Sequence, residues 1–175
     1  MMNKKKKYPQ LINYFSSTDD RGIFCKIFEK KLIKKFNFEI KEINFSYNKK
    51  RGTLRGIHYQ DIPKNEDKLV CCIKGKIYDV VLNIQKKSKN FLKYKSFNLD
   101  ENKKQILYVP KGYAHGFQTL CDDCILVYLH SENFSKRLDR GLNALSKDLK
   151  IIWPIKKKIM SNKDRNLKKS NYEGI

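Results

Sequence analysis

The stretch Leu69-Val70-Cys71-Cys72-Ile73-Lys74-Gly75-Lys76-Ile77-Tyr78-Asp79-Val80-Val81-Leu82-Asn83-Ile84 decides the fold class of this chain. Two runs rich in β-branched and other apolar residues flank Lys74-Gly75, and each run has the length of a strand. A short glycine-containing turn between two such runs is typical of a β-hairpin. The stretch therefore predicts two β-strands that pair through a turn at Gly75.

Short β-type runs recur along the rest of the chain, at residues 106–109, 116–120 and 125–130. Helical patterning is weak, and residues 28–36 are the best short candidate. Many short strands with one or two helices are typical of a β-sandwich or barrel. Because the sequence contains no repeat and no Pro/Gly/Ser-rich linker, we expect a single domain over residues 1–175, with the basic tail 156–175 packed outside the barrel.

The sequence gives no indication of export or of a membrane segment. No apolar run has membrane-spanning length, and the lysine cluster at residues 1–7 lacks the apolar core of a signal peptide. The five cysteines, an odd number without an export signal, favour reduced thiols. Cys121-Asp122-Asp123-Cys124 has the spacing of half a zinc site, but no second pair has that spacing, so an ordinary loop is expected. We predict a cytoplasmic protein without a membrane partner.

The net charge of +21 raises the question of nucleic acid as a partner. Six of the 39 basic residues are arginine, whereas the remainder are lysines scattered among Asn and Ile. Proteins that read nucleic acids favour arginine, with interleaved aromatic residues for single strands. We therefore expect no nucleic-acid partner, and we assign the few arginines to an anionic small-molecule substrate.

Arg55-Gly56-Ile57-His58-Tyr59-Gln60 is the motif that indicates chemistry. A lysine, Lys68, follows the histidine after ten residues, and a tyrosine, Tyr128, stands on a later β-type run. An imidazole, an ammonium group and a phenol are the components of a proton-transfer site. On a regular strand Arg55 and His58 would point to opposite faces, so a bulge or a strand end is needed for both to serve one pocket.

Metal binding is the obvious alternative for histidines in a small β-fold. Such a site needs a close pair of histidines, a nearby Glu and a third His on a later strand. Here His58 is followed by Tyr59 and Gln60, and the other two histidines, His115 and His130, are widely separated. The sequence predicts a site without a metal ion or another cofactor.

The chain resembles the dTDP-4-dehydrorhamnose 3,5-epimerase family over nearly its whole length. The strongest motifs are Gly52-Thr53-Leu54-Arg55-Gly56-Ile57-His58-Tyr59-Gln60 and Val109-Pro110-Lys111-Gly112-Tyr113-Ala114-His115-Gly116-Phe117. The supporting motifs, in the order that the family pattern expects, are Asp20-Arg21-Gly22-Ile23-Phe24, Asp139-Arg140-Gly141, Ile152-Trp153-Pro154 and Ser161-Asn162-Lys163-Asp164-Arg165. The resemblance implies a cupin-type jelly-roll fold, mainly β with a few short helices, and a homodimer.

The resemblance also implies catalytic roles. His58 matches the general base, and Asp164 matches the carboxylate that orients it. Tyr128 matches the tyrosine that donates a proton from the opposite face, and Lys68 matches the lysine near the substrate carbonyl oxygen. This set suits the chemistry, because a C–H beside a ketone loses its proton readily only when the enolate is stabilised.

The remaining matched positions are expected to bind the nucleotide sugar. Arg21 and Arg55 match contacts to the diphosphate and sugar, and His115 matches a further pocket histidine. Three departures from the family pattern fall on positions near the nucleotide: Lys26 replaces a Glu, Glu42 replaces a Gln two residues before Asn44, and Asn133-Phe134 stand where a Tyr is usual.

Glu42 raises the possibility of a guanine nucleotide. Guanine presents two adjacent donors to a carboxylate, whereas thymine presents one donor between two acceptors. Both a dTDP-linked hexose and a GDP-linked heptose therefore stay open as substrates. A carboxylate that does not discriminate between GDP and dTDP would contradict the guanine hypothesis.

The sequence thus predicts an epimerase that inverts C3, C5 or both beside the 4-keto group of a nucleotide-linked 4-keto-6-deoxy sugar, for surface polysaccharide biosynthesis. A C3-only epimerase and a ketoisomerase on the same fold are the neighbouring alternatives. A non-catalytic cupin module that binds sugar nucleotides is the alternative from another class of protein.

Overall fold

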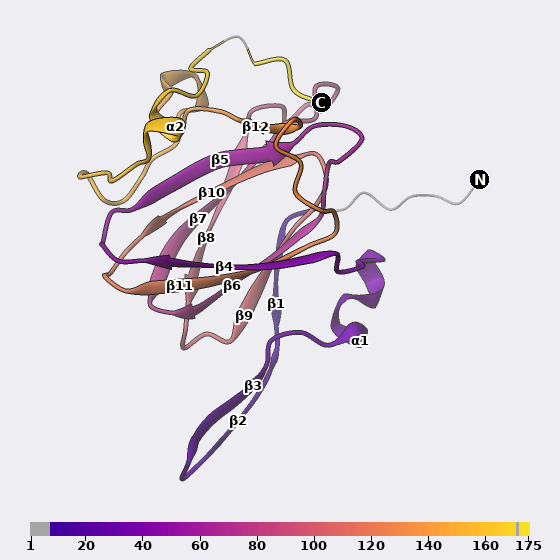
Figure 1. The fold of residues 1–175 in the computed structure, drawn as a ribbon, viewed down its shortest axis with the longest axis vertical. Coiled ribbons are helices and arrows are strands. Elements are labelled where there is room, and N and C mark those ends of the chain that lie inside the picture. Colours follow the sequence, from indigo (N-terminus) through magenta and orange to yellow (C-terminus); the bar gives the residue numbers. More distant parts are fainter. Residues whose placement is uncertain (1–7, 171) are drawn as a thin grey trace.

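Two antiparallel five-stranded sheets pack face to face as a jelly-roll sandwich in the computed structural model, which describes residues 8–170 and 172–175 (Figure 1). The first sheet has the order β1 (Gln10–Asn13), β9 (Gln105–Val109), β6 (Lys68–Lys74), β11 (Cys124–His130) and β4 (Glu42–Asn48). The second has the order β12 (Asp139–Gly141), β5 (Leu54–Gln60), β10 (Tyr113–Thr119), β7 (Lys76–Asn83) and β8 (Tyr94–Asp100). The predicted mainly-β jelly-roll class is confirmed. The lysine cluster at residues 1–7 lies outside the described residues.

The smaller elements lie outside the two sheets. β2 (Phe15–Asp19) and β3 (Gly22–Lys26) form a hairpin that projects away from the sandwich (Figure 1). The helical segment predicted at residues 28–36 is confirmed as two short turns, α1 (Lys30–Ile33) and η1 (Lys34–Phe36). Two more short helices, η2 (Lys147–Leu149) and α2 (Asn162–Arg165), follow the last strand.

The predicted hairpin at Gly75 is wrong, although both of its strands exist. β6 belongs to the first sheet and β7 to the second, so the turn at Gly75 crosses from one sheet to the other. Gly75 has a φ of +83°, and a Cβ there would lie 2.6 Å from the Cys124 sulfur and 3.0 Å from that of Cys121. A glycine is needed at this corner for the same reasons as in a hairpin turn, so the local sequence does not distinguish the two.

The central strands β6 and β7 are buried on both faces over most of their length, which explains their unbroken apolar runs. Between the sheets, Val70, Val81 and Leu126 belong to one buried cluster. The outer face of the first sheet is covered by the helical segment, where the Phe36 ring stacks on Tyr108 with centroids 3.9 Å apart. The outer face of the second sheet packs against the segment that follows β12. The buried apolar residues of that segment are Leu142, Ala144, Leu149 and Trp153.

The C-terminal segment, drawn in yellow, runs beside β5 (Figure 1). Ile159 exchanges two backbone hydrogen bonds with the start of β5, because Leu54 N donates to Ile159 O and Ile159 N donates to Gly52 O. Asn143 N donates to Lys168 O. These contacts hold α2 against β5 and bring its one buried residue, Asp164, behind the strand.

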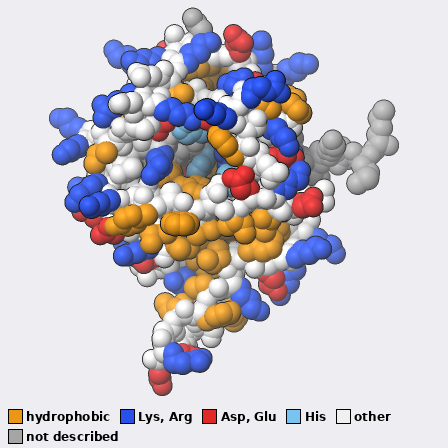
Figure 2. All heavy atoms as spheres, viewed as in Figure 1, with side chains coloured by type: hydrophobic (Ala, Val, Ile, Leu, Met, Phe, Trp, Pro, Cys, Tyr) orange, Lys and Arg blue, Asp and Glu red, His pale blue; other side chains and the backbone are white. Residues whose placement is uncertain are grey.

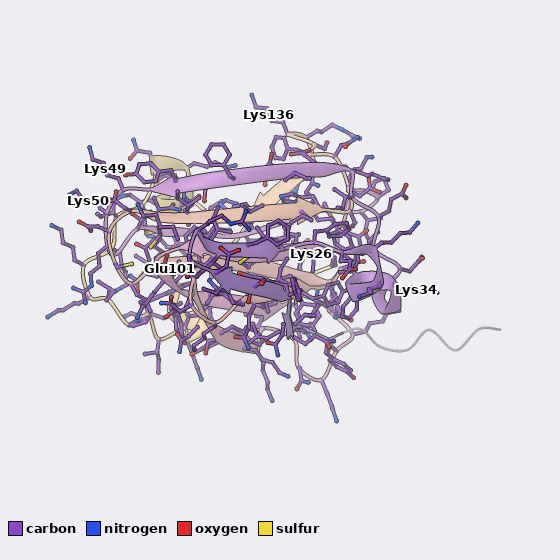
Figure 3. The ribbon with its side chains drawn as sticks, turned by 90° about the horizontal axis from the view of Figure 1, so that it is seen from below. Lys26, Lys34, Lys49, Lys50, Glu101 and Lys136 are labelled. Atoms are coloured by element: carbon purple, nitrogen blue, oxygen red, sulfur yellow. The ribbon has the colours of Figure 1, made fainter. Side chains whose placement is uncertain are left out.

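The labelled lysines lie far apart on the surface. In Figure 3, Lys49 and Lys50 lie at one end of the sandwich, Lys34 at the other, and Lys136 beyond one face. Their positive charge is therefore spread around the molecule. In the described part of the chain, no helix has both the length and the apolar character needed to cross a membrane.

Candidate active site

A pocket of about 430 Å³ opens between the two sheets. Figure 2 shows histidine side chains at the bottom of a hollow on this face. The first sheet and the loop before β6 contribute Glu42, Asn44, Phe45, Ser46, Glu66, Lys68, Tyr128 and His130. The second sheet and the segments near it contribute Arg55, His58, Tyr59, Gln60, His115, Gly116, Phe117, Phe134, Asp139 and Lys163. Side chains from both sheets can therefore reach opposite sides of one bound molecule.

A β-bulge brings Arg55 and His58 into the same pocket, as the sequence requires. On β5 and β10, Arg55 pairs with Phe117 and His58 pairs with His115, so β5 contains one extra residue between the two pairs. Gly56 lies in this bulge with a φ of +104°, and a Cβ there would lie 2.8 Å from backbone atoms of Gly116 and His115. Of the two expected possibilities, a bulge or a strand end, the structure has the bulge, and it depends on glycine at position 56.

His58 is paired with Asp164. The His58 Nε2 and Asp164 Oδ1 atoms are 2.9 Å apart, and Gly56 N donates to Asp164 Oδ2 at 3.2 Å. Burial opposes ionisation of Asp164, but the hydrogen bonds from His58 and Gly56 outweigh it and hold the pKa of Asp164 below its ordinary value. Because the carboxylate accepts a hydrogen bond from Nε2–H, Nδ1 is the unprotonated nitrogen of the neutral ring.

Gly141 lies beside this unprotonated nitrogen. Nδ1 of His58 is buried and has no hydrogen-bond partner among the described residues. A Cβ at position 141 would lie 3.1 Å from Nδ1 and 2.7 Å from Leu167 Cδ1. The Asp139-Arg140-Gly141 segment, which pairs with β5 as strand β12, thus packs closely against the Nδ1 edge of the ring, where a side chain larger than that of glycine would collide.

Tyr128 faces the pocket from the other sheet. It lies on β11, with Asn44 of β4 and Val70 of β6 as its cross-strand neighbours. Its hydroxyl lies 3.1 Å from Ser46 Oγ. Burial raises the pKa of Tyr128 well above its ordinary value, so the phenol keeps its proton through the neutral range and can donate it.

Lys68 lies in the same row of the first sheet as two other polar residues. His130 is the cross-strand partner of Lys68 on one side and of Glu42 on the other. The Lys68 ammonium group lies 3.1 Å from Glu66 Oε1, and His130 Nδ1 lies 2.8 Å from Glu66 Oε2. The ammonium group of Lys68 is therefore held at the pocket wall by a carboxylate.

His115 forms a second buried pair in the second sheet. Its Nε2 lies 2.8 Å from Oδ2 of Asp79, which is fully buried. Burial raises the pKa of the Asp79 carboxyl above its ordinary value, although the neighbouring imidazole opposes the shift. Asp79 fixes the orientation of the His115 ring in the pocket wall.

The remaining predicted pocket residues form the rim. Arg55 donates from Nε to Asn48 Oδ1 at 2.7 Å. Glu42 accepts hydrogen bonds from the backbone N of Phe134 at 2.8 Å and from Asn44 Nδ2 at 2.6 Å. These bonds, led by that from Phe134, hold the pKa of Glu42 below its ordinary value, so a carboxylate lines this part of the pocket.

Arg21 and Lys26 lie away from the pocket of their own chain. Both belong to the projecting hairpin of β2 and β3. The Arg21 side chain is 91% exposed and forms an ion pair with Asp19, 2.7 Å apart. Lys26 places its ammonium group 5.6 Å from the Phe15 ring centroid. The structure thus brings together every other predicted site residue and leaves these two at the surface.

Four pocket-lining residues and one residue behind the wall were not singled out from the sequence as site residues: Glu66, His130, Asp139 and Lys163 line the pocket, and Asp79 lies behind His115. The alternation of the strand could have identified one of them, because His130 follows Tyr128 by two residues and so faces the same side of β11. In residues 8–170 and 172–175, no group of three His, Cys, Asp or Glu side chains is arranged to hold a metal ion.

The arrangement can move a proton bound to carbon. An imidazole supported by a carboxylate lies on one sheet, a protonated phenol lies on the other, and an ammonium group lies in the same wall as the phenol. A ketone bound between the sheets could lose a proton from its neighbouring carbon to one side, and the planar enolate that forms could gain a proton from the other side.

Comparison with known proteins gives a consistent result. Residues 10–171 match the family model described as dTDP-4-dehydrorhamnose 3,5-epimerase. An enzyme of that name from Shigella flexneri is 37% identical over 151 residues, which cover 85% of this chain and 83% of the relative. The crystal structure of another, from Bacillus anthracis with TDP and PPi bound, has a TM-score of 0.87 and 36% identity, covering 91% of this chain and 92% of that chain. A 3'-monoepimerase from Streptomyces bikiniensis, in complex with dTDP-quinovose, has a TM-score of 0.85 and 28% identity, covering 91% of this chain and 82% of that chain.

Proposed function

We propose that this chain, which belongs to the dTDP-4-dehydrorhamnose 3,5-epimerase family, inverts C3, or C3 and C5, of a nucleotide-linked 4-keto-6-deoxy sugar. The observation that carries the proposal is the position of the His58–Asp164 pair and Tyr128 on opposite sheets of one pocket. Inversion of a carbon requires removal of a proton from one face and delivery to the other. The product is a deoxysugar nucleotide for surface polysaccharide biosynthesis.

His58 takes the proton from the carbon beside the ketone. Asp164 accepts the Nε2–H and, as a carboxylate, stabilises the imidazolium that forms. A positioned base of this kind contributes on the order of 100- to 10,000-fold to the rate. Lys68 stabilises the enolate oxygen, and loss of one such donor typically costs on the order of 100- to 1000-fold. Tyr128 then donates its proton to the opposite face of the carbon.

The reaction needs neither a metal ion nor a redox cofactor in this mechanism. Removal and return of a proton leave the oxidation state of the sugar unchanged. Lys68 supplies the positive charge that a Lewis acid would otherwise supply. The five cysteines are free thiols in the structure, which agrees with our proposal that the enzyme works in the cytoplasm.

We further propose that two copies of the chain form the working unit. β4 is the edge strand of the first sheet and exposes Ile43, Phe45 and Tyr47 on its outer face. The hairpin of β2 and β3 exposes Phe15, Ile23 and Phe24. Figure 2 shows an apolar band below the hollow that continues onto the hairpin. An exposed apolar surface of this extent is typical of a protein interface.

A homodimer also gives Arg21 a role. In a single copy its guanidinium group is exposed beside Asp19 and does not line the pocket. If the hairpin packs against a second copy beside β4, Arg21 can contact the diphosphate in the partner's pocket. Arg55 of the same pocket would then share the diphosphate charge, as bidentate guanidinium groups do with phosphate.

The nucleotide is proposed to be dTDP, because relatives of this chain carry dTDP in their names and ligands. A GDP-linked sugar is the second candidate, favoured by the ionised Glu42 in the pocket lining. Calorimetry of wild-type protein and Glu42→Gln with GDP and dTDP separates the two. Tighter binding of GDP than of dTDP by wild-type protein, lost in Glu42→Gln, supports guanine, whereas tighter binding of dTDP by wild-type protein, retained in the variant, supports thymine.

The proposed function is tested by proton NMR in D₂O with dTDP- and GDP-linked 4-keto sugars. The expected result is deuterium at C3, or at C3 and C5, with one nucleotide and loss of that exchange in His58→Asn. Exchange at C3 alone identifies a 3-epimerase, and movement of the keto group from C4 identifies a ketoisomerase. Binding of either substrate without exchange would leave the non-catalytic cupin module in place of the enzyme.

A further inference from the structure

All three histidines of the chain line one pocket, and each is paired with a carboxylate. Two of these pairs, His58–Asp164 and His115–Asp79, have their histidine on the second sheet. The third, His130–Glu66, lies in the first sheet beside Lys68. The proposed mechanism uses Lys68 but gives no role to this third pair.

Glu66 joins Lys68 to His130 with both of its oxygens. Oε1 lies 3.1 Å from the Lys68 ammonium group and Oε2 lies 2.8 Å from His130 Nδ1. The Glu66 carboxylate is 5% exposed, whereas Lys68 and His130 are 13% and 16% exposed, so these two partners reach the pocket and the carboxylate lies behind them. A carboxylate that is so well buried holds its partners firmly, because little water competes with it.

The hydrogen bond from His130 also determines which of its nitrogens faces the substrate. A carboxylate oxygen can only accept here, so Nδ1 carries the proton. Nε2 has no hydrogen-bond partner among the described residues, and His130 lines the pocket. This second nitrogen is therefore available to the pocket.

The charge of this group depends on His130. Burial opposes ionisation of Glu66, but the hydrogen bond from His130 and the charge of Lys68 hold the pKa of Glu66 below its ordinary value. With a neutral imidazole, Glu66 offsets the charge of Lys68. With an imidazolium, a net positive charge remains at this wall of the pocket.

We propose that Glu66 and His130 are positioning residues for Lys68: Glu66 aims the ammonium group, and protonation of His130 releases its charge toward the enolate oxygen. The inference rests on the proposed function, because it assigns Lys68 to the enolate. The charged and titratable groups that face His130 are Glu66 from the loop before β6, Lys68 from β6, Glu42 from β4 and Tyr128 from its own strand. Across the pocket, Asp139 and Lys163 are paired with each other.

His130→Gln tests the charge contribution. Glutamine can still donate a hydrogen bond to Glu66 but cannot take up a proton. The wild-type to variant ratio of kcat/KM is expected to be larger at pH 6 than at pH 8, on the order of tenfold. Taking the ratio cancels every effect of pH that the two proteins share. An equal ratio at the two pH values would overturn the proposal.

Variants of Glu66 test the aiming of Lys68. Glu66→Ala removes the anchor of the ammonium group, and kcat is expected to fall on the order of 10- to 100-fold while KM changes less than about threefold. Glu66→Gln keeps an acceptor for Lys68 and should restore part of kcat. Equal losses in both variants would contradict a positioning role. Glu132→Gln is the matched control, since Glu132 bridges Lys41 and Lys64 outside the pocket lining and should leave kcat unchanged.

A measurement without substrate separates this inference from the proposed function. With three histidines, the ¹⁵N spectrum of the imidazoles is assigned by one variant of each. The neutral ring of His130 is expected in the Nδ1–H form in wild-type protein, and this preference should disappear in Glu66→Ala. A wild-type Nε2–H form would overturn the pairing even in an active epimerase, whereas the expected form in a protein without exchange activity would count against the function alone.

Discussion

His58 and Tyr128 line the same pocket from opposite sheets of the sandwich. Each is fixed by a separate contact, His58 by Asp164 at 2.9 Å and Tyr128 by Ser46 at 3.1 Å. The base His58 and the acid Tyr128 can thus be replaced independently, and each substitution is expected to change deuterium exchange and epimer formation differently.

Tyr128→Phe is expected to separate exchange from inversion. His58 should still remove the proton and return solvent deuterium to the same face, while epimer formation falls on the order of 100- to 10,000-fold. NMR in D₂O measures both, as label in the substrate and as new product. Ser46→Ala, which removes the neighbour of the phenol but not its proton, should retain inversion within roughly tenfold. Undiminished epimer formation by Tyr128→Phe would exclude the phenol as the donor.

Asp164→Asn is expected to lower stability at neutral pH but less in acid. Because the pKa of Asp164 is lower in the folded protein, its contribution is present above about pH 4 and is lost as the pH falls through the folded pKa. Urea unfolding at pH 7 should show a loss of roughly 1–3 kcal/mol, with a smaller difference from wild type at pH 3. Asp19→Asn, in an exposed pair with Arg21, should differ little from wild type at either pH. A difference that is constant with pH would rule out this linkage.

Gly56→Ala is expected to damage both stability and activity. A Cβ at position 56 would meet backbone atoms of Gly116 and His115 at 2.8 Å, and the bulge that aims His58 would have to shift. Gly22 provides the control, because it has a φ of +127° but no atom within 4 Å of a new Cβ. Thermal unfolding should show a larger loss for Gly56→Ala than for Gly22→Ala, for which only backbone strain of about 1–3 kcal/mol is expected. Equal losses would mean that strain alone matters.

Mixed dimers test whether Arg21 acts in the partner's pocket. Homodimers of His58→Asn and of Arg21→Ala should each be impaired. In a mixed dimer, one pocket then combines an intact His58 with the intact partner hairpin, so mixing the two inactive proteins should restore activity. Failure to restore activity, with mixed dimers demonstrated by mass, would place Arg21 outside the catalytic unit.

Much of the fold and site could be predicted because β-structure and motif order are encoded locally. The strands at residues 69–84 were expected from their β-branched content, and the bulge beside His58 followed from strand alternation with Arg55. Local sequence did not reveal how strands pair. Gly75 allows either a hairpin or a corner between sheets, and the difference lies in the strands that pair with β6 and β7, most of which are far away in sequence.

The partners of the pocket histidines were harder to predict for the same reason. Glu66 and Asp79 are ordinary acidic residues in the sequence, and their roles depend on strand register and burial. Arg21 is the opposite case, because its motif is visible in the sequence but a single copy of the chain does not bring it to the pocket.

The lysines spread over the surface have opposite effects on the two proposed binding events. A long-range positive field attracts a nucleotide sugar with an anionic diphosphate and speeds its encounter with the enzyme, whereas it makes two copies of the chain repel each other. Added salt screens both effects. Higher ionic strength therefore slows substrate capture while it strengthens dimerisation. Low salt favours the first event and high salt the second, so the enzyme should work best at an intermediate ionic strength.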